Sequence, residues 1–137
     1  MRRYLLDTGA ASDVINRRHG AYERAQSAFQ QGHVIGLATP VLGELLAGIE
    51  ASASREPNLV RLAHGIRRLR IWSFDKPAAE EFGRLSATLK RIGRPMQQID
   101  VQIAATALSL GNCTVVTKDS DFAAVPALNV VDWSIGV

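Results

Sequence analysis

The chain opens with Arg3-Tyr4-Leu5-Leu6-Asp7-Thr8, a short apolar run that ends at an acid. We expect a buried strand over residues 3–6, because a short apolar run with polar boundaries is typical of a strand covered on both faces. Asp7 then stands at the carboxyl end of that strand, which is where open parallel α/β sheets bind their ligands. On local grounds Asp7 also suits the cap of a following helix, and both interpretations stay open.

Short apolar runs and helical patterns alternate along the rest of the chain. Further strands are expected over residues 33–38, 70–74, 114–117 and 128–131. Helices are expected over residues 10–18, 22–31, 41–51, 59–69, 76–92 and 99–110, with Asp75 as a cap and Gly111 as a terminator. The helix at 41–51 is so apolar that we expect burial on most of its sides. This alternation predicts an α/β protein with a parallel sheet of about five strands and helices on both faces. No linker divides the chain, so we expect one domain over residues 1–137.

Composition excludes several classes of protein. Apolar residues make up 47% of the 137 residues and charged residues 21%, as expected for an ordered globular domain. The single cysteine, Cys113, excludes an internal disulfide framework and a cysteine zinc site, and the three histidines lie far apart. No apolar run is long enough for a leader or a membrane span, so a cytoplasmic protein is expected. The net charge of +3 is compatible with a nucleic-acid partner but does not decide it.

Five acids occupy positions where a carboxylate is costly or faces a strand end. Glu44 and Asp100 lie within apolar helical patterns, and Asp119 and Asp121 directly follow the fourth expected strand. Each has a local alternative: an ion pair or an exposed edge for Glu44, a helix cap for Asp100, and a loop with a cap for the other two. Together with Asp7, however, they can converge on one cleft at the carboxyl ends of the strands.

A cluster of carboxylates suggests a specific chemistry. Sets of oxygen ligands suit Mg²⁺ or Mn²⁺, and such ions serve phosphodiester hydrolysis by activating water and neutralising charge. The remaining acids are expected to be solvated or to cap helices, and these are Asp13, Glu23, Glu50, Glu56, Asp75, Glu80, Glu81 and Asp132.

An ordered set of motifs carries a resemblance over essentially the whole chain. The motifs are Leu5-Leu6-Asp7-Thr8, Leu42-Gly43-Glu44-Leu45, Ile99-Asp100-Val101-Gln102-Ile103-Ala104-Ala105 and Val116-Thr117-Lys118-Asp119-Ser120-Asp121-Phe122. In this order they resemble the PIN-domain family, and most of all the VapC-type ribonuclease toxins of toxin–antitoxin pairs. The resemblance implies a three-layer α/β/α fold and cleavage of RNA that depends on Mg²⁺ or Mn²⁺.

The resemblance also implies roles for residues of the cleft. Asp7 and Asp100 fall on the principal metal ligands of the family, Glu44 and Asp119 on its other acidic positions, and Asp121 on a more variable acid of second rank. Thr8 and Thr117 match hydroxyl-bearing positions that orient carboxylates or waters. Gly9 departs from the family, which often has Asn at that position.

Substrate and partners follow from the same resemblance. RNA would be held by basic residues around the cleft, with an ordinary solvated surface as the alternative; the candidates are Arg17, Arg18, Arg55, Arg91, Arg94 and Lys118. A homodimer and a small antitoxin protein are implied, and the antitoxin could enter apolar grooves beside the helices that contain residues 42–49 and 59–69.

Two other functions compete with the toxin. One is a regulatory or trafficking partner of a DNA-binding protein, with weak or incidental nuclease activity and the same acids. The other is a phospho-receiver domain, which usually needs an adjacent acidic pair early in the chain, whereas Asp7 stands alone and Asp100 falls on a helix.

Overall fold

A five-stranded parallel sheet forms the centre of the protein. The computed structural model describes residues 1–134, so residues 135–137 of the expected domain lie outside the described part. The strands are β1 (Arg3–Leu6), β2 (Val34–Ala38), β3 (Arg70–Trp72), β4 (Cys113–Val116) and β5 (Asn129–Val131). They lie in the order β3-β2-β1-β4-β5 and all pair in parallel, so the expected α/β sheet is confirmed.

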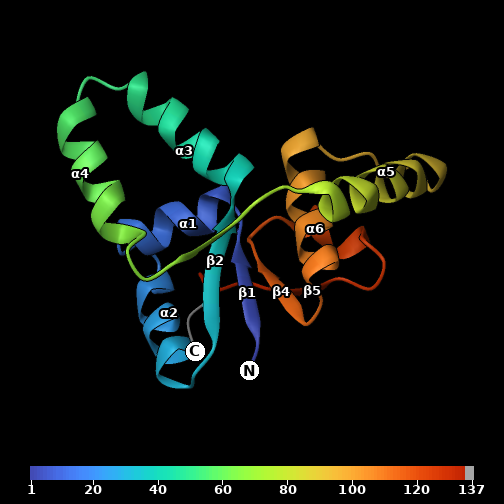
Figure 1. Ribbon diagram of the computed structural model, residues 1–137, viewed down its shortest axis with the longest axis horizontal. Coiled ribbons are helices and arrows are strands. Elements are labelled where there is room, and N and C mark those ends of the chain that lie inside the picture. The colour runs from blue at the N-terminus through green and yellow to red at the C-terminus, as the bar shows by residue number, and fades with distance from the viewer. Residues whose placement is uncertain (135–137) are drawn as a thin grey trace.

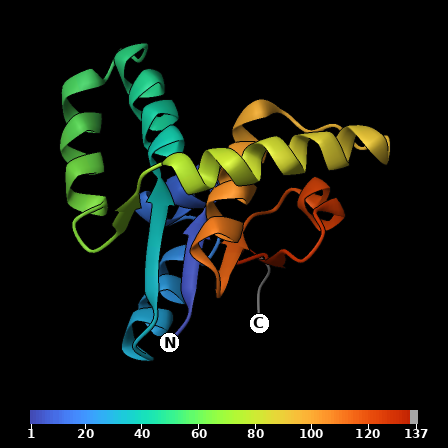
Figure 2. The ribbon, with the colours of Figure 1, turned by 45° about the vertical axis from the view of Figure 1, so that its right-hand side comes forward.

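Helices cover both faces of this sheet. They are α1 (Thr8–Ile15), α2 (Ala21–Gln30), α3 (Thr39–Glu50), α4 (Arg55–Gly65), α5 (Lys76–Arg91) and α6 (Gln98–Leu110), with a 3-10 helix η1 (Ser120–Ala124). Helices α1 and α2 lie behind the sheet and α5 and α6 in front of it, whereas α3 and α4 rise beyond the upper end of β2 (Figures 1 and 2). Across residues 1–134, no helix combines the length and the apolar character needed to cross a membrane.

The order of the strands places the acids together. Strands β2 and β3 are added on one side of β1, and strands β4 and β5 on its other side, so the strand order has a switch point between β1 and β4. The crevice outside such a switch point is where open α/β sheets bind ligands. Leu6 of β1 is in register with Val116 of β4, and the Asp7 amide donates to the Val116 carbonyl at 3.1 Å. The residues that follow β1 and β4 are therefore neighbours at the carboxyl edge of the sheet.

Local sequence explains where the elements begin and end. Asp75 caps α5 by accepting the Ala78 amide at 3.1 Å, with Pro77 in the first turn, and Gly111 ends α6 with φ 72°, as expected. Gly36 lets β2 approach β3, because a Cβ there would lie 2.2 Å from the carbonyl oxygen of Arg70.

Two expectations about the helices at the upper edge were wrong. Helix α3 is not buried on most sides, since Val41 is its one buried residue and Gly43, Glu44 and Leu46 are exposed. It projects beyond the sheet and packs along one side against α1, α4 and α6. The helix expected over residues 59–69 instead spans Arg55–Gly65, so the polar residues 55–57 join the helix and Leu69 is buried in the turn before β3.

Candidate acidic site

Five acids from different elements meet above the carboxyl ends of β1 and β4. Asp7 follows β1, Glu44 lies in α3, Asp100 in the first turn of α6, Asp119 follows β4, and Asp121 lies in η1. Burial raises the pKa of Asp100 to about 6, and the negative charges of Asp119, Asp7, Glu44 and Asp121 add to that rise. Because charge repulsion of this kind acts over short distances, we call these five residues the acidic cluster.

Asp7 is held in place by its neighbours on two elements. Its Oδ1 atom accepts the Ala10 amide at 2.8 Å, so the helix-cap interpretation is also correct. The hydroxyl of Thr117 donates a second hydrogen bond to the carboxylate. Burial raises the pKa of Asp7 despite these two hydrogen bonds, and the nearby charge of Asp119 raises it further. The fixed, partly desolvated carboxylate is thus oriented but not neutralised.

Glu44 stands on the solvent side of the cluster. Its side chain is exposed and accepts a hydrogen bond at Oε1 from the hydroxyl of Thr8. The bond ties α3 to the first residue of α1 and limits the directions that the Glu44 carboxylate can take. Glu44 therefore corresponds to the exposed-edge alternative, yet its charge still acts on Asp100.

Thr117 organises the turn after β4. It is buried, and its Oγ1 atom accepts the Asp119 amide at 2.9 Å. Asp119 in turn accepts the Asp121 amide at Oδ1 at 2.9 Å, which caps η1. The expected loop and cap therefore exist, and they also fix the direction in which Asp119 leaves the sheet.

The donor atoms of the cluster fit a hard divalent cation. Every candidate ligand is a carboxylate oxygen, and the excess negative charge favours a cation among them. Within residues 1–134, no three Asp, Glu, His or Cys side chains are already arranged as ligands of an ion. Binding would therefore require small side-chain rotations, such as release of the Glu44 oxygen that Thr8 contacts. The fit lies in the chemistry of the donors rather than in preset distances.

Asp13 was expected to be solvated or to cap a helix, and this expectation was wrong. It lies in α1 with only 7% of its surface exposed. Its Oδ2 atom lies 3.1 Å from Nδ1 of His19 and 3.4 Å from Nζ of Lys118. The sequence signal was available, because Asp13 lies among the apolar residues Ala10, Ala11 and Val14.

The basic residues expected to grip RNA have several different surroundings. Arg55 forms ion pairs with Glu50 and Glu56, and Lys118 pairs with Asp13. The guanidinium of Arg17 stacks 4.1 Å from the centre of the Tyr22 ring, which places it beside α2. Arg18, Arg91 and Arg94 are exposed.

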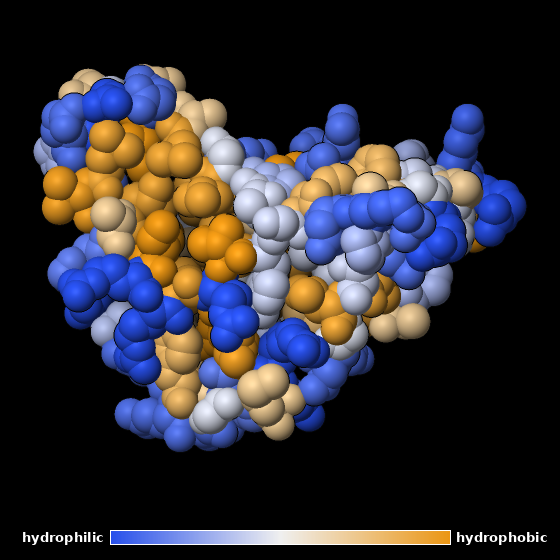
Figure 3. Space-filling view, viewed as in Figure 1, coloured by the Kyte–Doolittle hydropathy of each residue, from blue (hydrophilic) through white to orange (hydrophobic). Residues whose placement is uncertain are grey.

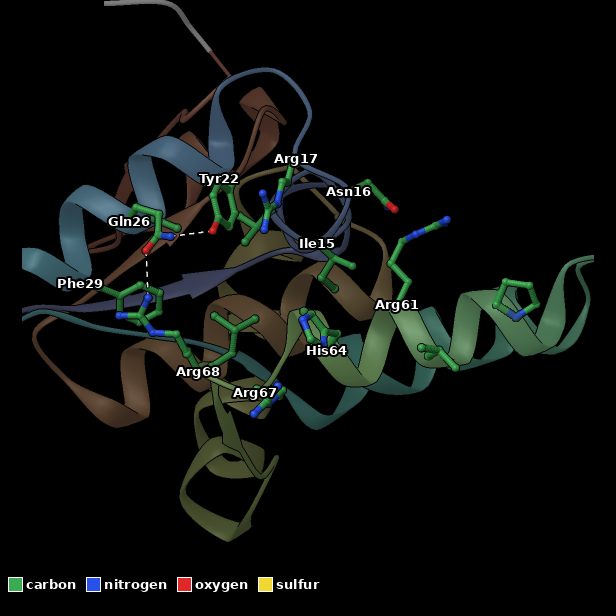
Figure 4. Close-up of a pocket in the computed structure, with 16 residues that line it drawn as sticks. Ile15, Asn16, Arg17, Tyr22, Gln26, Phe29, Arg61, His64, Arg67 and Arg68 are labelled. Carbon is green, nitrogen blue, oxygen red and sulfur yellow. Dashed lines mark hydrogen bonds between the residues drawn. The ribbon is translucent and has the colours of Figure 1, made fainter.

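A separate groove opens between α2, α4 and the end of α1. Its volume is about 1030 Å³, with Ile15, Phe29 and Val60 among its apolar residues. Arg61, Arg67 and Arg68 line it as well (Figure 4), and the described lining residues include no acid. Arg68 donates to Gln26 at 2.9 Å and stacks on the Phe29 ring. On the face seen in Figure 3, apolar side chains gather over α3 and α4 and are bordered by hydrophilic ones. A smaller cavity of about 290 Å³ lies between α1, α3 and α4 and includes Leu45 and Ile49.

Known proteins resemble the chain over almost its full length. A family model for the PIN domain matches residues 4–128. The tRNA(fMet)-specific endonuclease VapC of Shigella flexneri is 31% identical over 98% of this chain and 100% of the relative. The protein of the same name from Salmonella typhimurium is 33% identical over 97% of this chain and 99% of the relative. The crystal structure of VapBC2 from Rickettsia felis bound to a promoter DNA fragment superposes with a TM-score of 0.88 at 27% identity, and the match covers 96% of this chain and 98% of that one.

Proposed function

The chain belongs to the PIN domain family, and on that premise we propose that it is a divalent-metal-dependent endoribonuclease that acts as the toxin of a toxin–antitoxin pair. The proposal depends above all on one observation: four other carboxylates contribute to the raised pKa of Asp100. A fold alone does not define a function, but such a concentration of negative charge at a switch point needs a cation to balance it. The full-length relatives named as ribonucleases support RNA as the substrate.

Asp7 and Asp100 would hold the divalent cation, with Glu44 and Asp119 completing the ligand set and Asp121 in second rank. When bound, Mg²⁺ or Mn²⁺ would supply an activated water and charge neutralisation at the scissile phosphate. Thr117 and the Ala10 amide orient Asp7, and the Thr8 hydroxyl orients Glu44. These contacts limit the rotamers of the ligands before the substrate arrives.

RNA would be held by exposed cations around the cluster, of which Arg18, Arg91 and Arg94 are the best available candidates. Arg55 and Lys118 already form ion pairs and Arg17 stacks on Tyr22, so their role in binding would require a change of partner. Arg18 and Arg91 donate 3.3 Å hydrogen bonds to the hydroxyls of Ser12 and Thr88 rather than to an acid. Because two relatives are named as endonucleases specific for tRNA(fMet), this tRNA is the first substrate to test, and an RNA target would be consistent with a cytoplasmic protein.

An antitoxin segment is the proposed occupant of the groove between α2 and α4. The groove combines an apolar floor with cations and has no acid among its described lining residues, so it would suit an amphipathic segment that carries acidic side chains. Structures of related VapBC pairs support such a partner. A homodimer also belongs to the proposal, because the projecting helix α3 leaves Leu46 exposed.

Cleavage of a mixed cellular RNA pool tests the proposed activity. Purified protein is incubated with Mg²⁺, Mn²⁺ or EDTA, beside an Asp7→Asn/Asp100→Asn double variant. The matched control is Asp75→Asn, because Asn is as good a helix cap as Asp, and Asp75 is exposed and is not among the acids whose charge acts on Asp100. We expect discrete cleavage that requires metal, survives in the control and disappears in the double variant. Absence of cleavage by folded, antitoxin-free protein would instead favour a regulatory partner of a DNA-binding protein.

A further inference from the structure

The pairing of Asp13 with Lys118 and His19 is not explained by the fold. Asp13 lies in the last turn of α1, where Asp has a low helix propensity, and it is 7% exposed. Burial of a carboxylate costs free energy that an ion pair with a half-exposed lysine recovers only in part. A neutral residue at position 13 would therefore leave α1 at least as stable as Asp13 does.

Lys118 lies beside the acidic cluster, and its charge acts on one member of it, Asp7. It lies between the buried Thr117 and Asp119 in sequence, and its ammonium group is close enough to Asp7 to lower the pKa of that carboxyl. The side chain is 50% exposed and has a flexible four-carbon stem. A lysine with this freedom, whose charge already acts on Asp7, would be attracted into the acidic cluster.

Asp13 supplies a contact that directs the Lys118 ammonium away from the acidic cluster. Its Oδ2 atom lies 3.4 Å from Nζ of Lys118, on the helix that packs behind the sheet (Figure 1). The charge of Lys118 also acts on Asp132, which follows β5, so acids outside the cluster attract it from two elements. His19 contacts the same oxygen of Asp13 and helps to fix the carboxylate.

We propose that Asp13 is a positioning residue that holds the Lys118 ammonium against α1 and so keeps it out of the acidic cluster, where it would compete with the divalent cation. The inference rests on the proposed metal-dependent function. Asp13 would then affect the affinity for the metal only through the position of Lys118. Loss of the Asp13 charge should therefore weaken metal binding only while Lys118 is present.

Direct Mn²⁺ binding to purified protein, measured as the loss of the free-ion electron paramagnetic resonance signal, tests the proposal without RNA or catalysis. The variants are Asp13→Asn, Lys118→Met and the combination of both, with circular dichroism as the check of folding. Asn keeps the shape of Asp13 and a hydrogen bond to His19. Asp13→Ser, a smaller neutral substitution, answers the same question if Asp13→Asn fails to fold.

We expect Asp13→Asn to raise the apparent Kd for Mn²⁺ about fivefold or more, which corresponds to blockage of the site in about four of five molecules. Lys118→Met should bind Mn²⁺ at least as tightly as the wild type, and the double variant should match Lys118→Met. Unchanged affinity in Asp13→Asn would overturn the proposal. A double variant as weak as Asp13→Asn would also overturn it, because Asp13 would then have a merely structural role. If the folded wild type takes up no Mn²⁺, the proposed metal-dependent function itself fails.

Discussion

Replacement of Asp100 by Asn should stabilise the metal-free protein while it removes a candidate ligand. Burial and the four neighbouring carboxylates raise the pKa of Asp100 from its ordinary value of 3.8 to about 6. The folded state therefore binds a proton more readily than the unfolded state between these two values, and the free energy of unfolding falls as the pH rises through this window. Above about pH 6 the full cost of the charged Asp100 is present.

The magnitude follows from the same shift. A rise from 3.8 to about 6 corresponds to a cost of about 3 kcal/mol for the charged form. Because Asp100 is partly exposed, screening by solvent reduces this cost, and we expect about 1–2 kcal/mol. For a chain of this size, that is an increase of about 3–6 °C in Tm.

Urea and thermal unfolding in EDTA provide the assay, at pH 8 and at pH 4.5. At pH 8 Asp100→Asn should be more stable than the wild type by the stated amount, and at pH 4.5 most of the difference should vanish. Asp75→Asn is the control, because it changes an exposed helix cap of equal quality at both pH values. Destabilisation by Asp100→Asn at pH 8, or a difference that does not change with pH, would refute the idea that the acidic cluster stores charge repulsion.

Three further perturbations test other parts of the structure. Millimolar Mn²⁺ should raise the Tm of the wild type but not that of an Asp7→Asn/Asp100→Asn variant, since ligand binding stabilises only a protein that has the site; equal shifts in scanning calorimetry would contradict the metal assignment. Gly36→Ala should lower the free energy of unfolding in urea by about 2 kcal/mol or more, because its Cβ would lie 2.2 Å from the carbonyl oxygen of Arg70, and a neutral result would contradict the close approach of β2 and β3. Val60→Glu should weaken binding of the cognate antitoxin about tenfold or more in calorimetric titration with Tm unchanged, because Val60 lines the groove and is 70% exposed; full affinity would place the antitoxin elsewhere.

The sheet and the order of its elements could be predicted because the local signals agree. Runs such as residues 3–6 and 114–117 are too short for helices and end at polar residues, and the structure contains strands there, Arg3–Leu6 and Cys113–Val116. Asp75 and Gly111 mark helix ends by their own chemistry, so these boundaries were also predictable. Convergence of the five acids follows from parallel strands that share one carboxyl edge.

Features that depend on tertiary packing were less predictable. The apolar sequence of α3 suggested burial, but the helix projects beyond the sheet and exposes Leu46. Asp13 looked like a surface acid, because its partner Lys118 lies more than a hundred residues away and contacts it only through the packing of α1 near the end of β4. The groove between α2 and α4 has the same origin, since it brings Tyr22 and His64 together from separate helices.

Cleavage of tRNA(fMet) under single-turnover conditions, at one saturating Mg²⁺ concentration, tests the central claim most directly. The rate is compared between the wild type and Asp100→Asn, with Asp75→Asn as the control. Loss of one ligand charge should lower the rate by about a hundredfold or more, because a bound ion contributes several kcal/mol to charge stabilisation in the transition state. We expect Asp100→Asn to be folded, more stable than the wild type at pH 8 and nearly inactive. Undiminished cleavage by this variant, or wild-type cleavage that persists in EDTA, would contradict the assignment of the acidic cluster as the metal-dependent ribonuclease site.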